Sequence, residues 1–122
     1  MTLKELDARF FRVERRWNPD VAITNPVIVF HTAERVEEAD GVQFLVPGQK
    51  MDECRMGSLV TLDLFFRGKA LEESGPRWDY SGTGLDDLTL SPGIDCYFKC
   101  RWWHGFVRDG EVVERLDRSV KL

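Results

Sequence analysis

The chain has little of what marks membrane, secreted or disulfide-bonded proteins. It contains no apolar run near the roughly 20 residues that a membrane-spanning helix needs. Its first residues, Met1 to Asp7, lack the apolar core of a secretion signal. Its three cysteines are few and odd in number, which fits a reducing compartment better than a disulfide framework. We therefore expect a cytoplasmic protein.

The sequence also lacks internal repeats, low-complexity segments and linkers. Its 122 residues are enough for a single domain, 1–122, that buries a core without disulfides. The net charge of −4 argues weakly against non-specific binding to nucleic acid. The ordinary share of hydrophobic residues indicates a globular domain.

What the sequence does contain is a strong hairpin signal near its C-terminal end. Asp109-Gly110 lies between two apolar segments, 106–108 and 111–113. A two-residue Asp-Gly loop favours a type I′ turn, because both central residues must adopt positive φ. We expect an antiparallel hairpin here, around which the rest of the chain is organised.

Short apolar segments separated by glycine and proline predict further strands. Alternating apolar and charged side chains predict a strand over 9–17, with a helix as the alternative. The β-branched run 26–31 is short and continuous, which is typical of a strand buried on both sides. Other strands are expected at 42–46, 59–66, 77–80 and 88–90. Such a set of short strands predicts a mostly β fold, a compact antiparallel β-sandwich or open barrel with one or two short helices.

Two short helices are expected beside these strands. Thr2 and Glu5 have the spacing of a capping box, in which each side chain accepts the other residue's backbone N–H. This pair predicts a helical turn through Asp7. Thr32 is placed to cap a second helix over 33–39.

Cys96, Cys100 and His104 recur at every fourth position, and Cys54 could join them as a fourth zinc ligand. Residues four apart on a straight strand are separated by about 13 Å. Two ligands of one zinc lie within about 4 Å of each other. We therefore favour a core stripe along one strand face, in which alternate residues from Cys96 to Phe106 point the same way. A zinc site remains the alternative, and we expect no cofactor.

Three other groups of residues have functional alternatives to a purely structural role. His104 could act as a general base beside a carboxylate such as Asp79 or Asp95. Asp86 and Asp87, with Asp79 upstream, could hold a cation, although their spacing matches no known loop and solvated turn carboxylates are the better interpretation. The segment 81–84 could offer backbone N–H groups to a phosphate, although a plain turn is the simpler interpretation.

Aromatic residues are concentrated in the same C-terminal region. We expect an exposed partner-binding surface formed by Tyr97, Arg101 and Trp103, because a strand can bury only one face. Basic residues also alternate with aromatic ones in 9–17, a composition that can bind single-stranded nucleic acid. Glu14 dilutes that charge, so nucleic acid is the less favoured partner.

Several motifs together resemble a family of small phage and prophage proteins, the domain of unknown function DUF6527. They are Arg77-Trp78, the segment Ser81-Gly82-Thr83-Gly84-Leu85-Asp86-Asp87-Leu88-Thr89-Leu90-Ser91-Pro92, and Trp103-His104-Gly105-Phe106-Val107-Arg108-Asp109-Gly110. Segments 2–10 and 38–45 are similar to the opening of the same family. The resemblance implies a protein that works in a bacterial host.

Members of that family carry a Cys-Pro-x-Cys knuckle and a cysteine before Trp-His-Gly, which together imply zinc. Here Val46-Pro47-Gly48-Gln49 stands at the place of the knuckle. Arg101 stands near the place of the later cysteine, with Cys100 beside it, and Cys54 is a candidate displaced remnant. The resemblance transfers no catalytic residue.

The sequence as a whole indicates an accessory protein that binds a host or phage protein. One alternative is a hydrolase-like enzyme that uses His104 and a nearby carboxylate. Another is an acidic inhibitor of a nucleic-acid-binding host defence protein. A concave site around His104 would favour the enzyme.

Overall fold

A computed structural model describes residues 1–16, 27–47, 61–69, 76–98 and 101–114. At positions 96–98, 101 and 102 it describes the backbone alone. These residues form mainly strands, with two single turns of 3-10 helix among them, η1 (Lys4–Leu6) and η2 (Val36–Glu38). No helix in these ranges is long and apolar enough to cross a membrane.

The strands form three antiparallel sheets. The largest has the order β2-β1-β3-β4 and consists of β1 (Arg9–Arg16), β2 (Val27–Ala33), β3 (Gly41–Leu45) and β4 (Thr61–Phe65). The others are β5 (Asp79–Ser81) with β6 (Thr89–Ser91), and β7 (Ile94–Phe98), β8 (Arg101–Arg108) and β9 (Glu111–Glu114). The predicted mostly β, antiparallel fold is confirmed, and none of the sheets closes into a barrel.

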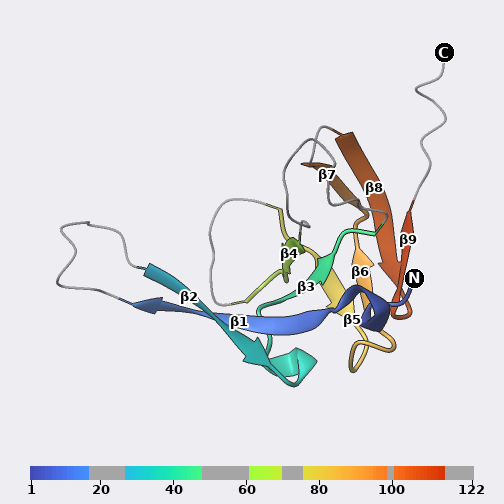
Figure 1. Ribbon diagram of the computed structural model, residues 1–122. Helices are drawn as coiled ribbons and strands as arrows, with labels where there is room; N and C mark the ends of the chain where they lie inside the picture. The colour runs from blue at the N-terminus through green and yellow to red at the C-terminus, as the bar shows by residue number, and fades with distance from the viewer. Residues whose placement is uncertain (17–26, 48–60, 70–75, 99–100, 115–122) are drawn as a thin grey trace, which may run out of the picture.

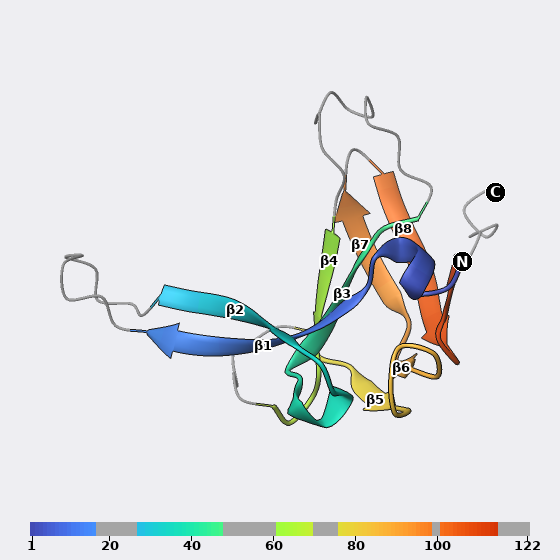
Figure 2. The same ribbon diagram turned by 60° about the horizontal axis from the view of Figure 1, so that its bottom comes forward.

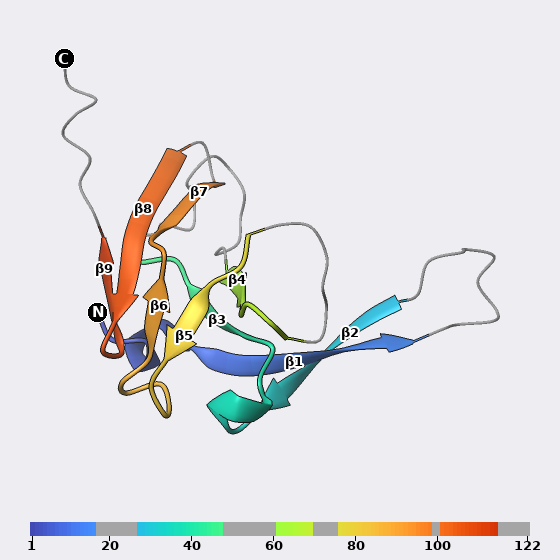
Figure 3. The same cartoon turned by 180° about the vertical axis from the view of Figure 1, so that it is seen from behind.

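One core joins the sheets. Figure 3 shows β8 and β9 at the end of the molecule opposite the β1–β2 hairpin, with β5 and β6 between them. The largest fully buried side chains of this core come from the N-terminal segment, from β3 and β8, and from residues next to β4 and β6. They are Leu3, Val42, Phe44, Phe66, Leu88, Trp103 and Val107. Burial of such side chains contributes about 1.5–3 kcal/mol each, so this core holds the sheets together.

The predicted hairpin is present between β8 and β9. Arg108 pairs with Glu111, and φ is 49° at Asp109 and 79° at Gly110, as a type I′ turn requires. A Cβ atom at Gly110 would lie 2.4 Å from the backbone oxygen of Asp86. The turn therefore needs glycine both for its φ and for its close approach to the loop before β6.

The predicted capping box is also present, and it brings the N-terminus onto β9. The Thr2 amide donates to Glu5 Oε1 at 2.8 Å, and the Glu5 amide donates to Thr2 Oγ1 at 3.2 Å. The Leu3 amide donates to the Gly110 carbonyl, and the Val112 amide donates to the Met1 carbonyl, both at 2.8 Å. Thr2 and Glu111 form an antiparallel bridge, so the first residues cover the outer edge of β9.

The β1–β2 hairpin extends away from the body as an arm (Figures 1 and 2). β1 pairs with β3 only over Arg9–Phe11, whereas it pairs with β2 at seven consecutive positions. Beyond the residues that pair with β3, the Val13 amide donates to the buried carboxylate of Asp40 at 2.8 Å instead of to a strand. The outer half of the arm is thus a two-stranded ribbon.

Two expectations for this region were wrong. β2 is not buried on both sides, because it lies at the edge of the sheet, and Val27 and Phe30 are 47% and 46% exposed. The expected helix over 33–39 is a single 3-10 turn, Val36–Glu38, because β2 continues to Ala33. Thr32 therefore belongs to the strand and makes no cap.

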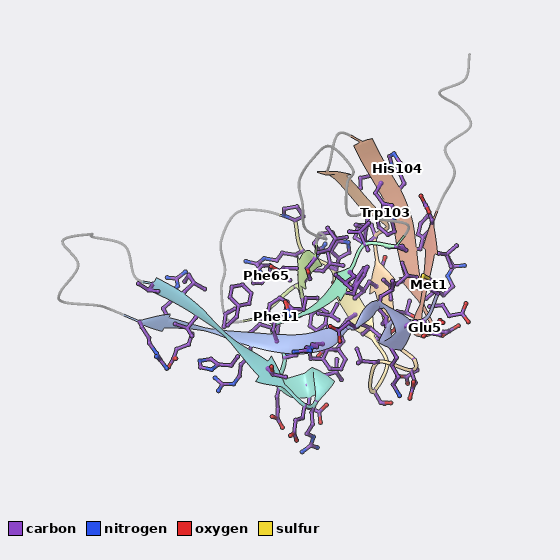
Figure 4. The ribbon with its side chains drawn as sticks, in the orientation of Figure 1. Met1, Glu5, Phe11, Phe65, Trp103 and His104 are labelled. Atoms are coloured by element: carbon purple, nitrogen blue, oxygen red, sulfur yellow. The ribbon has the colours of Figure 1, made fainter. Side chains whose placement is uncertain are left out.

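The expected core stripe from Cys96 to Phe106 was wrong as well. It assumed one continuous strand, but β7 ends at Phe98 and pairs back on β8, with Phe98 opposite Arg101. The alternation of faces restarts in β8, so Trp103 enters the core while His104 lies on the other side of the strand (Figure 4). Gly105 accommodates the Trp103 ring, which a Cβ atom there would meet at 2.2 Å.

Candidate functional site

Aromatic rings gather where the arm joins the body. Phe11 of β1 lies 5.1 Å from Phe30 of β2 and 5.2 Å from Phe65 of β4, measured between ring centroids. Phe30 and Phe65 are 6.2 Å apart. Figure 4 shows Phe11 and Phe65 together at this junction. Tilted and edge-on contacts at these distances add about 0.5–1.5 kcal/mol each to the burial of the rings.

We call this group the aromatic surface and define it as Phe11, Val13, Ile28, Phe30 and Phe65. Phe11 and Val13 are buried, Ile28 and Phe65 are half-buried, and Phe30 is exposed. The group is separate from the main core. It is therefore a small apolar cluster that is incompletely covered within the described chain.

Arginines flank the aromatic surface. The Arg77 guanidinium lies over the Phe65 ring at 5.0 Å from its centroid, a cation–π contact. Arg15 pairs with Ile28 in the β1–β2 register, which places it on the same face of the arm as Phe30. Positive charge therefore lies beside Phe65 and on the face of the arm that carries Phe30.

The opposite face of the arm carries an ion-pair cluster around Glu14. Glu14 accepts hydrogen bonds from Arg16 at 2.7 Å and contacts His31 Nε2 at 3.1 Å. The bonds from His31 and Arg16 hold the pKa of the Glu14 carboxyl below its ordinary value. The arm thus has one aromatic face and one face on which paired charges lie beside Val27 and Val29.

A second candidate site lies at the other end of the molecule, on the outer side of β7 and β8. His104 Nδ1 is hydrogen-bonded to Asp95 Oδ1, and these residues face each other in the strand register. The His104 side chain is 31% exposed and that of Asp95 is 72% exposed. The pair lines a hollow of about 330 Å³ together with Pro92, Gly93 and Phe106. His104 therefore has the concave setting and the carboxylate that the enzyme alternative requires.

A neighbouring hollow of about 660 Å³ shares Pro92, Gly93 and Asp95 with the first. Its remaining wall consists of Arg67, Pro76, Arg77 and Trp78. Arg67 is 3.4 Å from Asp79, the other carboxylate considered for His104. Of the two carboxylates considered, Asp95 is therefore the one that binds His104, whereas Asp79 forms an ion pair with Arg67.

The partner-binding residues expected from the sequence are not brought together. Trp103 is 1% exposed, so its assignment to an exposed surface was wrong. This error and the error about the core stripe have one cause, which is that β7 and β8 are two strands and not one continuous strand. Trp103 lies on the inner side of β8, as does Val107. Tyr97 pairs with Trp102 in the β7–β8 register, and Arg101 begins β8, but the side chains of all three lie outside the described part of the chain.

The candidate zinc ligands are only partly described. Cys54 and Cys100 lie outside the described residues, and Cys96 is described by its backbone alone. Within the described ranges, no group of three or more histidine, cysteine or acidic side chains is placed to hold a metal ion. The absence of zinc remains a prediction.

In the loop before β6, the side chain of Asp87 accepts the backbone N–H groups that a phosphate would need. The amides of Thr83 and Gly84 each donate to Asp87 Oδ1 at 2.9 Å, and the Thr83 hydroxyl donates to Oδ2 at 3.0 Å. These bonds hold the pKa of the Asp87 carboxyl below its ordinary value. Asp86 pairs with Lys4 at 2.9 Å. The plain-turn interpretation is the one that this geometry supports.

No protein-family model, curated protein or solved structure matches this chain. The resemblance to DUF6527 therefore stays a prediction. Function has to be argued from the two candidate sites themselves.

Sequence reasoning missed the aromatic surface because its members come from three separate strands. Phe11 and Phe30 meet only because β1 and β2 form a hairpin, and Phe65 joins them from β4. One signal was available in the sequence: the parity of β1 places Phe11, Val13 and Arg15 on one face. What that face would meet could not be derived from the parity.

Proposed function

We propose that this protein acts by binding a protein partner, as a small accessory protein of the phage or prophage type. The assignment to phage rests on the sequence resemblance. The binding mode rests on one observation, the aromatic surface, where Phe30 is 46% exposed, Arg77 lies over the Phe65 ring and Arg15 shares the face of the arm with Phe30. Exposed aromatic rings beside arginine are the typical composition of an interface hot spot.

The charge of the arm indicates the chemistry of that partner. β1 carries four arginines and one glutamate in eight residues, whereas the whole chain has a net charge of −4. A strand with this excess of positive charge attracts a surface of negative charge. The partner we propose therefore offers apolar side chains for the rings and a negatively charged surface for the arm.

The test is capture of partners from a lysate of the bacterial host by tagged protein, followed by quantitative mass spectrometry. The variant Arg15→Glu reverses the charge beside the rings without changing the rings. Val113→Glu is the control, since Val113 is 49% exposed on β9, at the other end of the molecule. We expect wild type and Val113→Glu to capture the same partner and Arg15→Glu to lose it. Equal capture by Arg15→Glu, or no partner for wild type, contradicts the proposal.

A second candidate, hydrolysis, is favoured by the His104–Asp95 pair in its hollow. A carboxylate bound to Nδ1 orients the imidazole and stabilises its protonated form, as in general-base catalysis. The described residues of the hollow include no serine, threonine or cysteine, so the reaction would use water as nucleophile. The assay compares wild type with His104→Ala on aryl ester and aryl phosphate substrates. Turnover by wild type alone supports hydrolysis. Equal rates for the two proteins contradict it.

A further inference from the structure

The outer edge of β2 can form backbone hydrogen bonds to another strand. β2 is the first strand of the sheet order β2-β1-β3-β4, so one of its sides pairs with β1 and no described strand pairs with the other. Its seven residues pair with β1 at consecutive positions with no interruption by a bulge. A regular strand of this kind presents a row of backbone N–H and C=O groups along its outer side.

The described residues of β2 carry none of the sequence features that commonly protect strand edges. Natural proteins discourage edge-to-edge pairing with lysine, proline, bulges or inward-pointing charges. β2 reads Val-Ile-Val-Phe-His-Thr-Ala and contains none of these. Val27 and Phe30, which lie on opposite faces of the strand, are both nearly half exposed. The edge is therefore suited to receive another strand.

We propose that the occupant is β2 of a second copy of this chain, paired antiparallel across a two-fold axis. Charge supports this choice. β2 has no carboxylate, lysine or arginine, so two identical strands meet without facing like charges. A partner strand with charged side chains would gain no opposite charge from β2. Self-pairing of one strand in a two-fold dimer is necessarily antiparallel, which is the arrangement already present throughout this sheet.

A register centred on Phe30 uses the whole strand. It places Phe30 opposite Phe30 of the second copy and Val27 opposite Ala33, so all seven residues find a partner. Directly opposed Cβ atoms in such a pair lie about 5 Å apart, close enough for the two rings to touch. With the axis perpendicular to the sheet, both copies keep their aromatic surfaces on the same side. The pairing joins two separate clusters into one continuous apolar strip.

This dimer does not depend on the proposed protein partner, and the two can be tested apart. Arg15 lies on β1, one strand in from the edge, and Val27 lies on the face opposite the aromatic surface. Arg15→Glu should abolish partner capture and leave the dimer intact. Val27→Lys should weaken the dimer and leave the aromatic surface intact.

The experiment is sedimentation equilibrium of the full chain from low micromolar to millimolar concentration. We expect wild type to convert from monomer to dimer, and Phe30→Lys to weaken the dimer at least about tenfold because two lysines would oppose each other. Val113→Lys is the matched control, since Val113 is as exposed as Phe30 but lies on β9. Because Phe30 also packs against Phe11, Val27→Lys serves as a second edge variant that spares the ring cluster.

A mixture of Phe30→Lys and Phe30→Glu tests the register. Each variant alone should be mostly monomeric, and an equal mixture should recover the dimer because opposite charges now face each other across the axis. Three results would overturn the proposal: wild type that stays monomeric throughout, a Val113→Lys variant that is weakened as much as the edge variants, or a mixture that stays monomeric. The first would leave the β2 edge to a strand of a different protein.

Discussion

β9 and β2 each lie at the end of a sheet, but only the outer edge of β9 is covered by a described segment. We call β9 the closed edge and β2 the open edge. β9 is covered by residues 1–3 through backbone hydrogen bonds from Leu3 to Gly110 and from Val112 to Met1. β2 has no described segment along its outer side. β9 also begins and ends with glutamate, whereas β2 contains no aspartate, glutamate, lysine or arginine.

The two ends of the molecule also differ in how closely their strands contact the rest of the fold. At β9, the turn, the N-terminal segment and the loop before β6 contact one another, so this edge contributes to the fold. At β2, the sheet continues past β3 as an arm with one aromatic face and one bare edge. Exposed apolar groups of this kind support the contact surface that we propose for β2 and the arm.

The largest effect should come from breaking the closed edge at its turn. Gly110→Val forces a β-branched residue to φ 79° and places its Cβ atom 2.4 Å from the Asp86 oxygen. We expect a loss of about 3 kcal/mol in the free energy of unfolding, measured by urea denaturation. Gly84→Val is the control, because a Cβ atom at Gly84 meets nothing within 4 Å. Equal stability of the two variants would contradict the tight packing of this turn.

A smaller effect should come from loosening the open arm at its base. Asp40→Ala removes the carboxylate that accepts the Val13 amide, so that this amide loses its partner where β1 leaves β3. The expected cost is about 1–3 kcal/mol. Asp40→Asn keeps an acceptor oxygen and should retain most of the stability in the same denaturation experiment. If alanine and asparagine have the same effect, the hydrogen bond to Val13 is not what holds the arm.

The smallest effect should be the pH dependence of the stability that Glu5 gives to the N-terminal segment, which covers β9. Hydrogen bonds from Thr2 lower the pKa of Glu5 from its ordinary 4.5. The contribution of Glu5 to stability is therefore fully present above pH 4.5 and is lost as pH falls through the lower pKa of the folded state. Glu5→Gln should unfold with a shallower pH dependence below pH 4.5 than wild type. Parallel curves for the two proteins would mean that the capping box does not contribute.

The sequence predicted the closed edge better than the open one, and the reason is the range of the interactions. The Asp109-Gly110 turn and the Thr2–Glu5 capping box depend on residues at most three positions apart, and both are confirmed. The alternation in β1 likewise depends on local side-chain order. Local rules such as these can be derived from a short window of sequence.

The errors come from features that only the whole sheet decides. The run Val27-Ile28-Val29-Phe30 has the composition of a central strand, but sheet order places it at the edge. Trp103 was assigned to the surface because the reversal of the chain between β7 and β8 carries no Asn-Gly or Asp-Gly signal. The pairing of His104 with Asp95 was one of two alternatives, and the β7–β8 register selects it.

Amide hydrogen exchange at two protein concentrations tests the contrast between the two edges most directly. The Val112 amide is bonded to Met1 within one chain, so its exchange should be slow and independent of concentration. The amides of β2 that point away from β1 should exchange rapidly in dilute protein and slow down at high concentration, as the second copy pairs with them. If these β2 amides exchange at the same rate at both concentrations, the β2 edge does not pair with a second copy.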